Sequence, residues 1–363
     1  MPSQKIPENW QWVTIWFILI ASAIYSRPLI PIDETRYLSV AWEMWSSNDF
    51  LVPHINGEPY SHKPPLLFWL IHLIWYVFGV SELYGRLVGP VFGLGAIMLT
   101  VRLAKILWPT EKDVRHAVPF VLLGTFVWNL YSSLTMFDTL LTFFILSGLL
   151  SILKASKSKS KWPWVGLSLS IGLGILAKGP IVFLYIVPPL VLVNLWCTNN
   201  TFSLKWWYGC SLLSLFAGVG IALCWAMPAA MAGGEEYKHA IFFSQTAGRM
   251  VKAFAHSRPF YWYFLLTPLL FMPWFFWLPL WRGQKTKSFD YATTFCICAI
   301  LPALFLLSLV SGKQIHYMLP ILPTCSLLIA RAVTGTVQRS VFDRIPLLLT
   351  WWPFRSFCGI VSA

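Results

Sequence analysis

The sequence has few charged residues and very few acidic ones. Only 11% of its 363 residues are charged and just 14 are Asp or Glu, whereas a soluble globular domain carries roughly 25% charged residues. Hydrophobic residues make up 57% of the chain and aromatic residues 17%, and the mean hydropathy is +0.65. This composition excludes a soluble globular protein and indicates an integral membrane protein.

The sequence also lacks an internal repeat and the alternating pattern of a membrane barrel strand. Apolar runs of about 17 to 25 residues recur instead, each long enough to cross a bilayer as a helix. We therefore predict an all-α integral membrane protein with about 11 to 12 transmembrane helices. No small-residue cleavage site follows the first run, which we interpret as an anchor. The runs cover residues 10–26, 66–80, 84–107, 117–134, 137–153, 162–177, 180–197, 206–231, 260–281, 290–311, 316–333 and, more weakly, 345–361.

The seven Cys residues show no metal-type spacing and lie mostly inside apolar runs, so we expect free thiols. The net charge of +13 comes from Lys and Arg in short loops between apolar runs, which is typical of cytoplasmic loops in membrane proteins. We therefore expect a bilayer and not a nucleic acid as partner. The basic loops are 102–115, 154–162, 282–287 and 331–344.

The two long polar loops, 27–65 and 232–258, are then expected on the opposite, extracytoplasmic face. Met136–Asp138, Lys178 and Gly312–His316 are expected there too. The run 66–80 is short for a span, and the sequence leaves open whether it crosses, re-enters or belongs to a broken pair. We predict one polytopic membrane domain over residues 1–363, without a large soluble C-terminal domain, in the inner membrane.

The first polar loop carries much of the acid and base chemistry of this apolar chain, and a long ordered loop is usually functional. Residues 32–46 have the apolar spacing of an amphipathic helix on the membrane surface. Asp33, Arg36 and Tyr37 share one face of this helix at i, i+3 and i+4. We interpret the loop as the place of the active site.

Three carboxylates are candidate catalytic residues. Asp33 and Glu34 could serve as a general base just outside a membrane span, and the alternative is a carboxylate that caps a helix. Asp138 lies at the edge of an apolar run, where a carboxylate is costly unless it is paired or hydrated. It is either functional or the N-cap of the next helix.

Four cations are candidates for binding a phosphate or a donor. Arg binds phosphate through two parallel hydrogen bonds, and Lys acts as a point charge. The alternative is that these side chains extend to lipid headgroups. His54, His62 and His256 are candidate metal ligands by residue type, but no HxxxH spacing supports a metal site. The four cations are Arg36, Lys63, Lys178 and Lys313.

Six segments resemble, in order, a known family. They are PIDETRY (31–37), HINGEPYSHKPPLLFWL (54–70), FDTLLTFF (137–144), GILAKGPI (174–181), AHSRPFYWYF (255–264) and SGKQIHYMLP (311–320). In this order they resemble the lipid A aminoarabinose transferases and the protein O-mannosyltransferases, which are membrane glycosyltransferases of the GT-C class. The resemblance runs over roughly residues 10–335.

The resemblance implies a GT-C-type helical bundle whose active site faces the periplasm. It implies a donor sugar on a polyprenyl phosphate and an extracytoplasmic acceptor. Asp33 matches the family's catalytic first-loop Asp, and Asp138 matches a second important carboxylate. Arg36 and Lys63 match cations that engage the carrier phosphate, and we add to the donor site Tyr37, which shares a helix face with Asp33 and Arg36.

The aminoarabinose transferases also bind a metal ion, through an acid just before the KP pair and a later His. His256 matches the later ligand, but His62 stands where the family has an acid. The resemblance thus makes His62 and His256 the candidate ligands of one divalent metal (Zn, Mg or Mn), and it implies no nucleotide cofactor.

We expect an inverting transferase that acts in cell-envelope modification, of lipid A or of another glycan, with Asp33 as the base. The aminoarabinose transferases continue with more spans and a soluble outer domain, so the acceptor stays open among lipid, glycan and protein. A transporter or flippase of lipid-linked sugars is the alternative, because it needs the same cavity and cations but no base. A non-catalytic assembly subunit is a third hypothesis.

Overall fold

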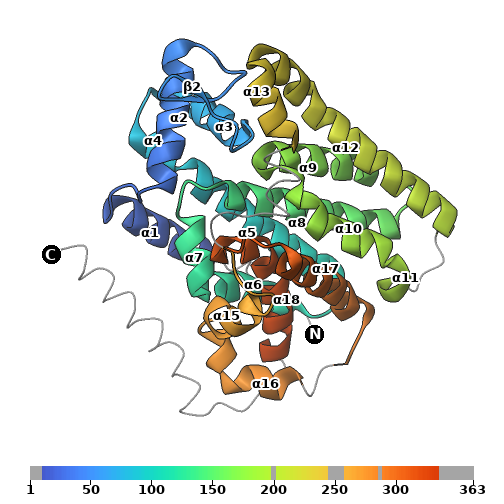
Figure 1. Cartoon of the computed structure of the whole chain (residues 1–363). Coiled ribbons are helices and arrows are strands. Elements are labelled where there is room, and N and C mark those ends of the chain that lie inside the picture. The colour runs from blue at the N-terminus through green and yellow to red at the C-terminus, as the bar shows by residue number, and fades with distance from the viewer. Residues whose placement is uncertain (1–9, 198–201, 244–256, 285–287, 335–363) are drawn as a thin grey trace.

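The computed structural model describes residues 10–197, 202–243, 257–284 and 288–334. These residues form a bundle of helices with one β-hairpin, whose two strands have two residues each (Figure 1). Within the described residues, five helices are long and apolar enough to cross a membrane, which is the architecture of a multi-pass membrane protein. They cover Glu82–Leu107, Phe137–Lys157, Leu204–Ala232, Tyr291–Leu309 and Ile315–Thr334.

The first half of the described chain consists of short and long helices and the hairpin. In order these are α1 (Gln11–Tyr25), α2 (Asp33–Ser47), β1 (His54–Ile55), β2 (Glu58–Pro59), α3 (Leu66–Phe78), α4 (Glu82–Arg86), α5 (Val88–Leu107), α6 (Lys112–Gly124), α7 (Phe126–Ser132), α8 (Phe137–Lys157) and α9 (Trp162–Lys178). The second half contains η1 (Pro180–Val182), α10 (Phe183–Val191), α11 (Val193–Trp196), α12 (Leu204–Ala232), α13 (Gly234–His239), α15 (Trp262–Leu270), η3 (Trp274–Phe276), α16 (Leu278–Gln284), α17 (Tyr291–Leu309), η4 (Ile315–Ile321) and α18 (Leu322–Thr334).

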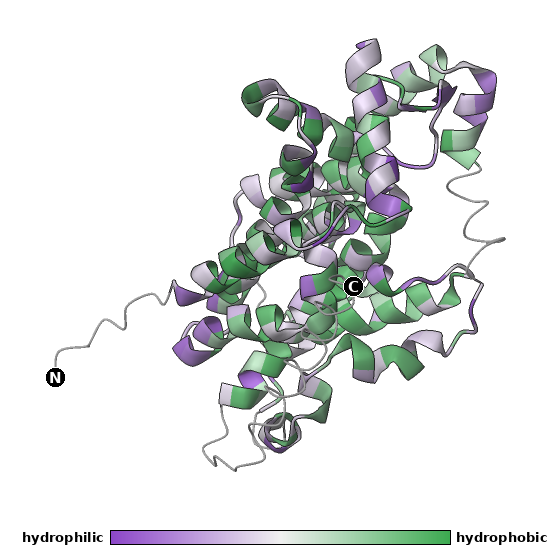
Figure 2. Cartoon of the chain, turned by 90° about the vertical axis from the view of Figure 1, so that its left-hand side faces the viewer, coloured by the Kyte–Doolittle hydropathy of each residue, from purple (hydrophilic) through white to green (hydrophobic). Residues whose placement is uncertain are grey.

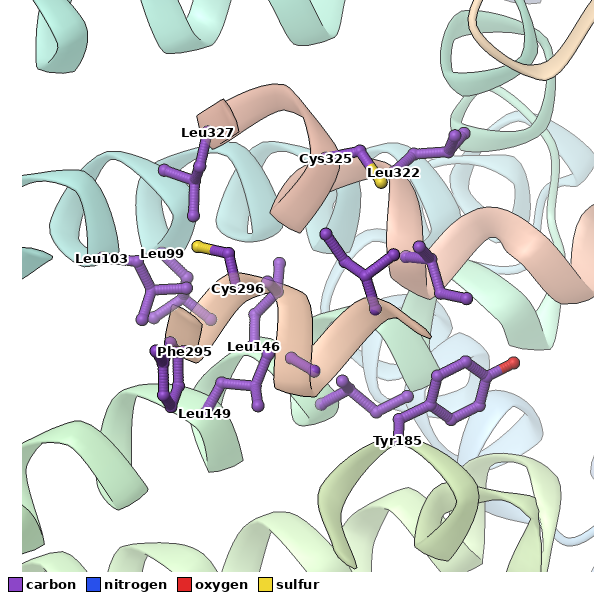
Figure 3. Close-up of a cluster of buried hydrophobic side chains, with 14 of the residues drawn as sticks. Leu99, Leu103, Leu146, Leu149, Tyr185, Phe295, Cys296, Leu322, Cys325 and Leu327 are labelled. Carbon is purple, nitrogen blue, oxygen red and sulfur yellow. The ribbon is translucent and has the colours of Figure 1, made fainter. Parts of the chain in front are cut away.

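The main apolar core lies between α5, α8, α10, α17 and α18 (Figure 3). Leucines of α5 and α8 meet Phe295 and Cys296 of α17 there, and Leu327 of α18 closes the cluster. In the most apolar window of α8, 83% of the residues are buried, against 22% in α12, so α8 is central and α12 peripheral. Figure 2 shows hydrophobic residues over most of the helical ribbon and hydrophilic residues at its turns and loops.

The first polar loop contains α2, which begins and ends one residue later than the predicted range of 32–46. The helix ends at Ser47 and is capped by Asn48, whose φ of 55° is the left-handed conformation that terminates many helices. The hairpin that follows turns at Asn56 and Gly57, with φ of 55° and 78°, as a two-residue Asn-Gly turn requires. The Glu43 carboxylate accepts hydrogen bonds from both turn amides, at 2.7 and 2.6 Å, and so attaches the hairpin to α2.

The segment α3–α4 leaves and returns at the same end of the bundle. A 13-residue helix is about 20 Å long, which is too short to cross the hydrocarbon core. His72 of α3 bonds through a ring nitrogen to the Ala41 carbonyl of α2 at 2.8 Å. At the far end of the segment, the Arg86 guanidinium donates to the Arg27 carbonyl at 3.2 Å. Residues 66–78 therefore pack on the first polar loop, and the candidate span that follows contains α5.

We call the end of the bundle that carries residues 27–65 the first-loop end. The opposite end, which carries residues 102–115 and 154–161, is the basic end. The Lys157 ammonium donates to the Ile106 carbonyl at 2.9 Å and to the Tyr291 hydroxyl at 3.1 Å, so two basic loops predicted on one face lie together.

A buried arginine joins four helices at the basic end. Arg331 of α18 pairs with Asp290 at 2.9 Å and with Glu111 at 3.2 Å, and its guanidinium carbon lies 5.0 Å from the centre of the Trp108 ring. Asp290 also caps α17 by accepting from the Thr293 amide at 2.8 Å. These contacts hold together the ends of α5 and α18 and the starts of α6 and α17.

Candidate active site at the first-loop end

A buried ion pair forms the centre of the candidate site. Asp138, the second residue of α8, pairs with Lys178, the last residue of α9, and the two side chains are only 3% and 6% exposed. The Lys178 ammonium lies 4.3 Å from the centre of the Tyr317 ring. His316 Nε2 approaches the second oxygen of Asp138 at 3.9 Å. A buried carboxylate needs such partners because its desolvation is costly, and α9 and η4 supply them.

Asp33 is the first residue of α2, and its side chain is attached to this centre through Tyr37. The Tyr37 hydroxyl donates to Asp33 Oδ1 at 3.2 Å. The Tyr37 ring is buried and packs edge-on against Phe137, the neighbour of Asp138, at 4.8 Å between ring centres. Burial raises the pKa of Tyr37, and the nearby Asp33 carboxylate raises it further, so the phenol stays a proton donor.

Lys63 joins the carboxylates from the end of the first polar loop. Its ammonium lies 5.7 Å from the centre of the Phe137 ring and acts electrostatically on Asp138. The charges of Asp33 and Lys63 also act on His316. The structure therefore brings together residues from four separate segments of the sequence.

Arg36 lies one helical turn after Asp33 and is half-buried. Its guanidinium has no salt-bridge partner in the part of the chain that the structure describes. A guanidinium in this position is able to bind an anion with two parallel hydrogen bonds.

Glu34 has a different environment from its neighbour Asp33. The carboxylate is fully buried and accepts hydrogen bonds from Arg27 and from the amides of Ile30 and Thr135, at 3.0 and 2.9 Å for the two amides. Burial raises the pKa of Glu34, but the hydrogen bonds from Arg27 and the two amides outweigh it and hold the pKa below its ordinary value. Glu34 thus fastens the start of α2 to the turn before α8.

Lys313 is held by the backbone. Its ammonium is buried and donates to the carbonyls of Arg258 at 3.0 Å and Val310 at 2.6 Å. Burial lowers its pKa. Among the contacts of the described residues, none joins Lys313 to the pair of Asp138 and Lys178.

The candidate metal ligands are only partly visible. His62 is exposed, with its ring 5.2 Å from that of Tyr60, and His256 lies outside the described residues. No three His, Cys, Asp or Glu side chains gather within residues 10–197, 202–243, 257–284 and 288–334. The described residues therefore supply one of the two implied ligands, and we derive no chemical step through a metal.

Sequence reasoning did not single out the aromatic and imidazole side chains around Asp138. The His316 ring lies 5.6 Å from that of Tyr131, and the Tyr185 hydroxyl donates to the Tyr317 carbonyl at 2.6 Å. The segment SGKQIHYMLP contains two of these residues. This segment could have pointed to these residues, but Tyr is too frequent in this chain to stand out alone.

The fold is similar to that of two membrane proteins of known structure. The structure is similar to ArnT from Cupriavidus metallidurans bound to undecaprenyl phosphate, with a TM-score of 0.76, 20% identity, and coverage of 97% of this chain and 64% of that one. It is similar to a lesser degree to the oligosaccharyltransferase of Archaeoglobus fulgidus, with a TM-score of 0.54, 12% identity, and coverage of 99% and 57%.

Sequence comparisons agree with this fold. A family model described as dolichyl-phosphate-mannose-protein mannosyltransferase matches residues 62–225. The undecaprenyl phosphate-alpha-4-amino-4-deoxy-L-arabinose arabinosyl transferase 2 of Proteus mirabilis is 25% identical over 316 residues, or 84% of this chain and 56% of that protein. The undecaprenyl phosphate-alpha-4-amino-4-deoxy-L-arabinose arabinosyl transferase of Pectobacterium atrosepticum is 25% identical over 348 residues, or 93% of this chain and 61% of that protein.

These findings confirm the resemblance that the ordered motifs predict. The chain is similar to the ArnT-like transferases along most of its own length, and it spans about three fifths of the length of the curated relatives it matches.

Proposed function

We propose that this chain is a membrane glycosyltransferase that moves a sugar from a polyprenyl-phosphate donor to an acceptor at the first-loop end. The observation that carries the proposal is the approach of Asp33 and Tyr37 to the buried pair of Asp138 and Lys178, with Lys63 beside them. The similar ArnT structure binds undecaprenyl phosphate, and the names of the relatives contain the same carrier, which supports this class of donor.

Asp33 is the proposed general base. It accepts the proton of the acceptor hydroxyl or amine while the acceptor oxygen or nitrogen bonds to the anomeric carbon of the sugar. The bond between that carbon and the carrier phosphate oxygen breaks, and its electron pair leaves with the phosphate. A single displacement of this kind inverts the anomeric configuration. Tyr37 positions Asp33 through its hydroxyl hydrogen bond.

Arg36 and Lys63 are the proposed ligands of the leaving phosphate. Arg36 lies one helical turn after Asp33 and has no salt-bridge partner among the described residues, and Lys63 lies beside the Phe137 ring. Phosphate charge grows as the bond breaks, so cations that are already in place lower the barrier. Lys178 and Lys313 are also predicted from the sequence as candidates for this role. The contacts of Lys178 suit a different role, the holding of Asp138, and those of Lys313 suit the bracing of residues 257–258.

Asp138 is proposed to orient the donor sugar or the nucleophile, with Lys178 and His316 fixing the direction of its carboxylate. Glu34 is proposed to act as a structural anchor, because its acceptor sites are already used by Arg27, Ile30 and Thr135. Of these two adjacent carboxylates, only Asp33 is then proposed to be catalytic.

We propose that the first-loop end faces the extracytoplasmic side of the inner membrane and that the basic end faces the cytoplasm. The five long helices are the candidate crossings among the described residues. The count of about 11 to 12 transmembrane helices stays a prediction.

The test is a transfer assay with purified protein and a polyprenyl-phosphate-linked sugar. Asp33→Asn is expected to reduce transfer by at least about a hundredfold, because general base catalysis contributes typically 10²–10⁴, while the protein remains folded in the membrane. Glu58→Gln is the matched control, since Glu58 is an exposed carboxylate of the same loop.

Full transfer activity of the Asp33 variant would contradict the proposal that Asp33 is the general base. Movement of the lipid-linked sugar across the bilayer, without any release or transfer of the sugar, would favour the flippase instead.

A further inference from the structure

A second site lies at the basic end, away from the catalytic residues. We propose that a cavity between α1, α5 and α6 binds the phosphate headgroup of an anionic phospholipid. The cavity has a volume of about 290 Å³. Its walls are Trp10, Trp12, Met98, Val101, Arg102, Arg115, His116 and Pro119.

The polar side of the cavity is suited to a phosphate. Arg102 of α5 and Arg115 of α6 both line it, and neither has a salt-bridge partner within the described residues. His116 Nε2 is buried and makes no hydrogen bond to any described residue. A buried polar atom without a partner costs free energy, and His116 lines the same cavity as the two arginines. Arginine is the preferred ligand of phosphate oxygens because its guanidinium bonds two of them at once.

The apolar side of the cavity is suited to a lipid and not to a free anion. Met98 and Val101 precede Arg102 on α5, and Met98 is 38% exposed. These side chains lie farther from the end of α5 than Arg102 does, where acyl chains would follow the headgroup. Trp10 and Trp12 belong to the start of α1, and Trp prefers the headgroup level of a membrane. Basic pockets between membrane helices bind anionic headgroups in this way.

The experiment compares two double variants that remove the same charge from the same two helices. Arg102→Gln with Arg115→Gln changes the cavity, whereas Lys105→Gln with Lys112→Gln removes two exposed ammonium groups that do not line it. The full chain is placed in nanodiscs of phosphatidylcholine with increasing phosphatidylglycerol. Native mass spectrometry then measures retained phosphatidylglycerol, and Trp fluorescence measures the melting temperature.

The arginine pair is expected to weaken retention of phosphatidylglycerol by about tenfold or more, with the lysine pair near the unchanged protein. Both variants should melt alike in pure phosphatidylcholine, so a general folding defect would be visible. Equal losses in the two variants would overturn the proposal, since the effect would then be the general attraction of a basic surface. Stabilisation by inorganic phosphate, without added benefit from the lipid, would overturn the lipid as occupant.

Discussion

Asp33 and Glu34 are adjacent in the sequence and have separate roles in the fold. Successive residues of a helix point about 100° apart, so Asp33 meets Tyr37 while Glu34 turns into the joint with Arg27 and Thr135. The sequence identifies the acidic pair as a candidate but does not show that its two members have different roles. The division depends on the amide of Thr135, which is 101 residues away along the chain.

Glu34→Gln is expected to destabilise the fold by roughly 3 kcal/mol at neutral pH, because Arg27 would lose its buried carboxylate. The folded pKa of Glu34 is lowered, so its ionised form stabilises the protein in full above the ordinary pKa of glutamate. That stabilisation is lost as the pH falls through the lowered pKa. The difference in melting temperature between the variant and the unchanged protein should therefore shrink in acid.

The matched control for Glu34 is Glu82→Gln. Glu82 also pairs with an arginine, Arg86, but its side chain is 56% exposed, so a change within about 0.5 kcal/mol is expected. Equal melting temperatures for the two variants at neutral pH would contradict the anchoring role of Glu34.

Asp138 and Lys178 are expected to behave as one unit in a double-mutant cycle. Asp138→Asn or Lys178→Met alone leaves a buried charge without its partner, which costs about 3–5 kcal/mol. The double variant should recover much of this stability, because no buried charge remains. Transfer activity should not recover with it.

Additive losses of stability in the double variant would show that the two charges do not depend on each other. Recovery of transfer together with stability would reduce Asp138 to a purely structural residue.

At the scale of elements, the pattern of apolar residues predicted α2 to within one residue at each end. The fate of the run 66–80 could not be predicted, because hydropathy does not distinguish a short helix in lipid from one packed against α2. Contacts such as that of His72 with the Ala41 carbonyl decide the matter, and they join residues 31 positions apart. The prediction of Lys313 as a phosphate ligand rests on its charge alone, since its carbonyl partners are not visible in the sequence.

The close packing of α5 on the turn before α8 depends on Gly89. A Cβ atom at this position would collide with the Leu134 carbonyl oxygen, which belongs to the rigid backbone. Gly89→Ala is therefore expected to cost about 1–3 kcal/mol and to reduce transfer, because the same turn leads to Asp138. Thermal melting and the transfer assay measure the two effects.

Gly220→Ala in α12 is the control, because no atom lies within 4 Å of its added Cβ. It should be neutral or slightly stabilising, as alanine favours a helix over glycine by about 0.5–1 kcal/mol. A Gly89 variant as stable and active as the Gly220 variant would contradict the proposed packing constraint.

At the scale of the whole molecule, the sequence predicted a helical membrane bundle with basic loops at one end and the catalytic candidates at the other. Lys157 and Ile106 confirm that two of the basic loops meet. The buried ionic joint at Arg331 was not predicted, because charges in this region were expected to face the cytoplasm.

Arg331→Gln is expected to lower stability by roughly 3 kcal/mol, since Asp290 and Glu111 would both lose their partner. Transfer per folded molecule should stay near normal below the melting temperature, because the joint lies at the basic end. Arg282→Gln, which removes an exposed guanidinium, should leave melting unchanged. A specific loss of transfer in the Arg331 variant, with normal melting, would contradict a purely structural joint.

The length of α12 has a consequence for the membrane around the protein. Its 29 residues make a rod of about 43 Å, while the hydrocarbon core is about 30 Å thick, so the helix must tilt or project beyond the lipid. Near its outer end, Ala229 packs with Tyr237 against Val52 of the first polar loop. A thicker or thinner bilayer would change that tilt and press on Val52, so acyl chain length itself becomes a physical input to the geometry around Asp33.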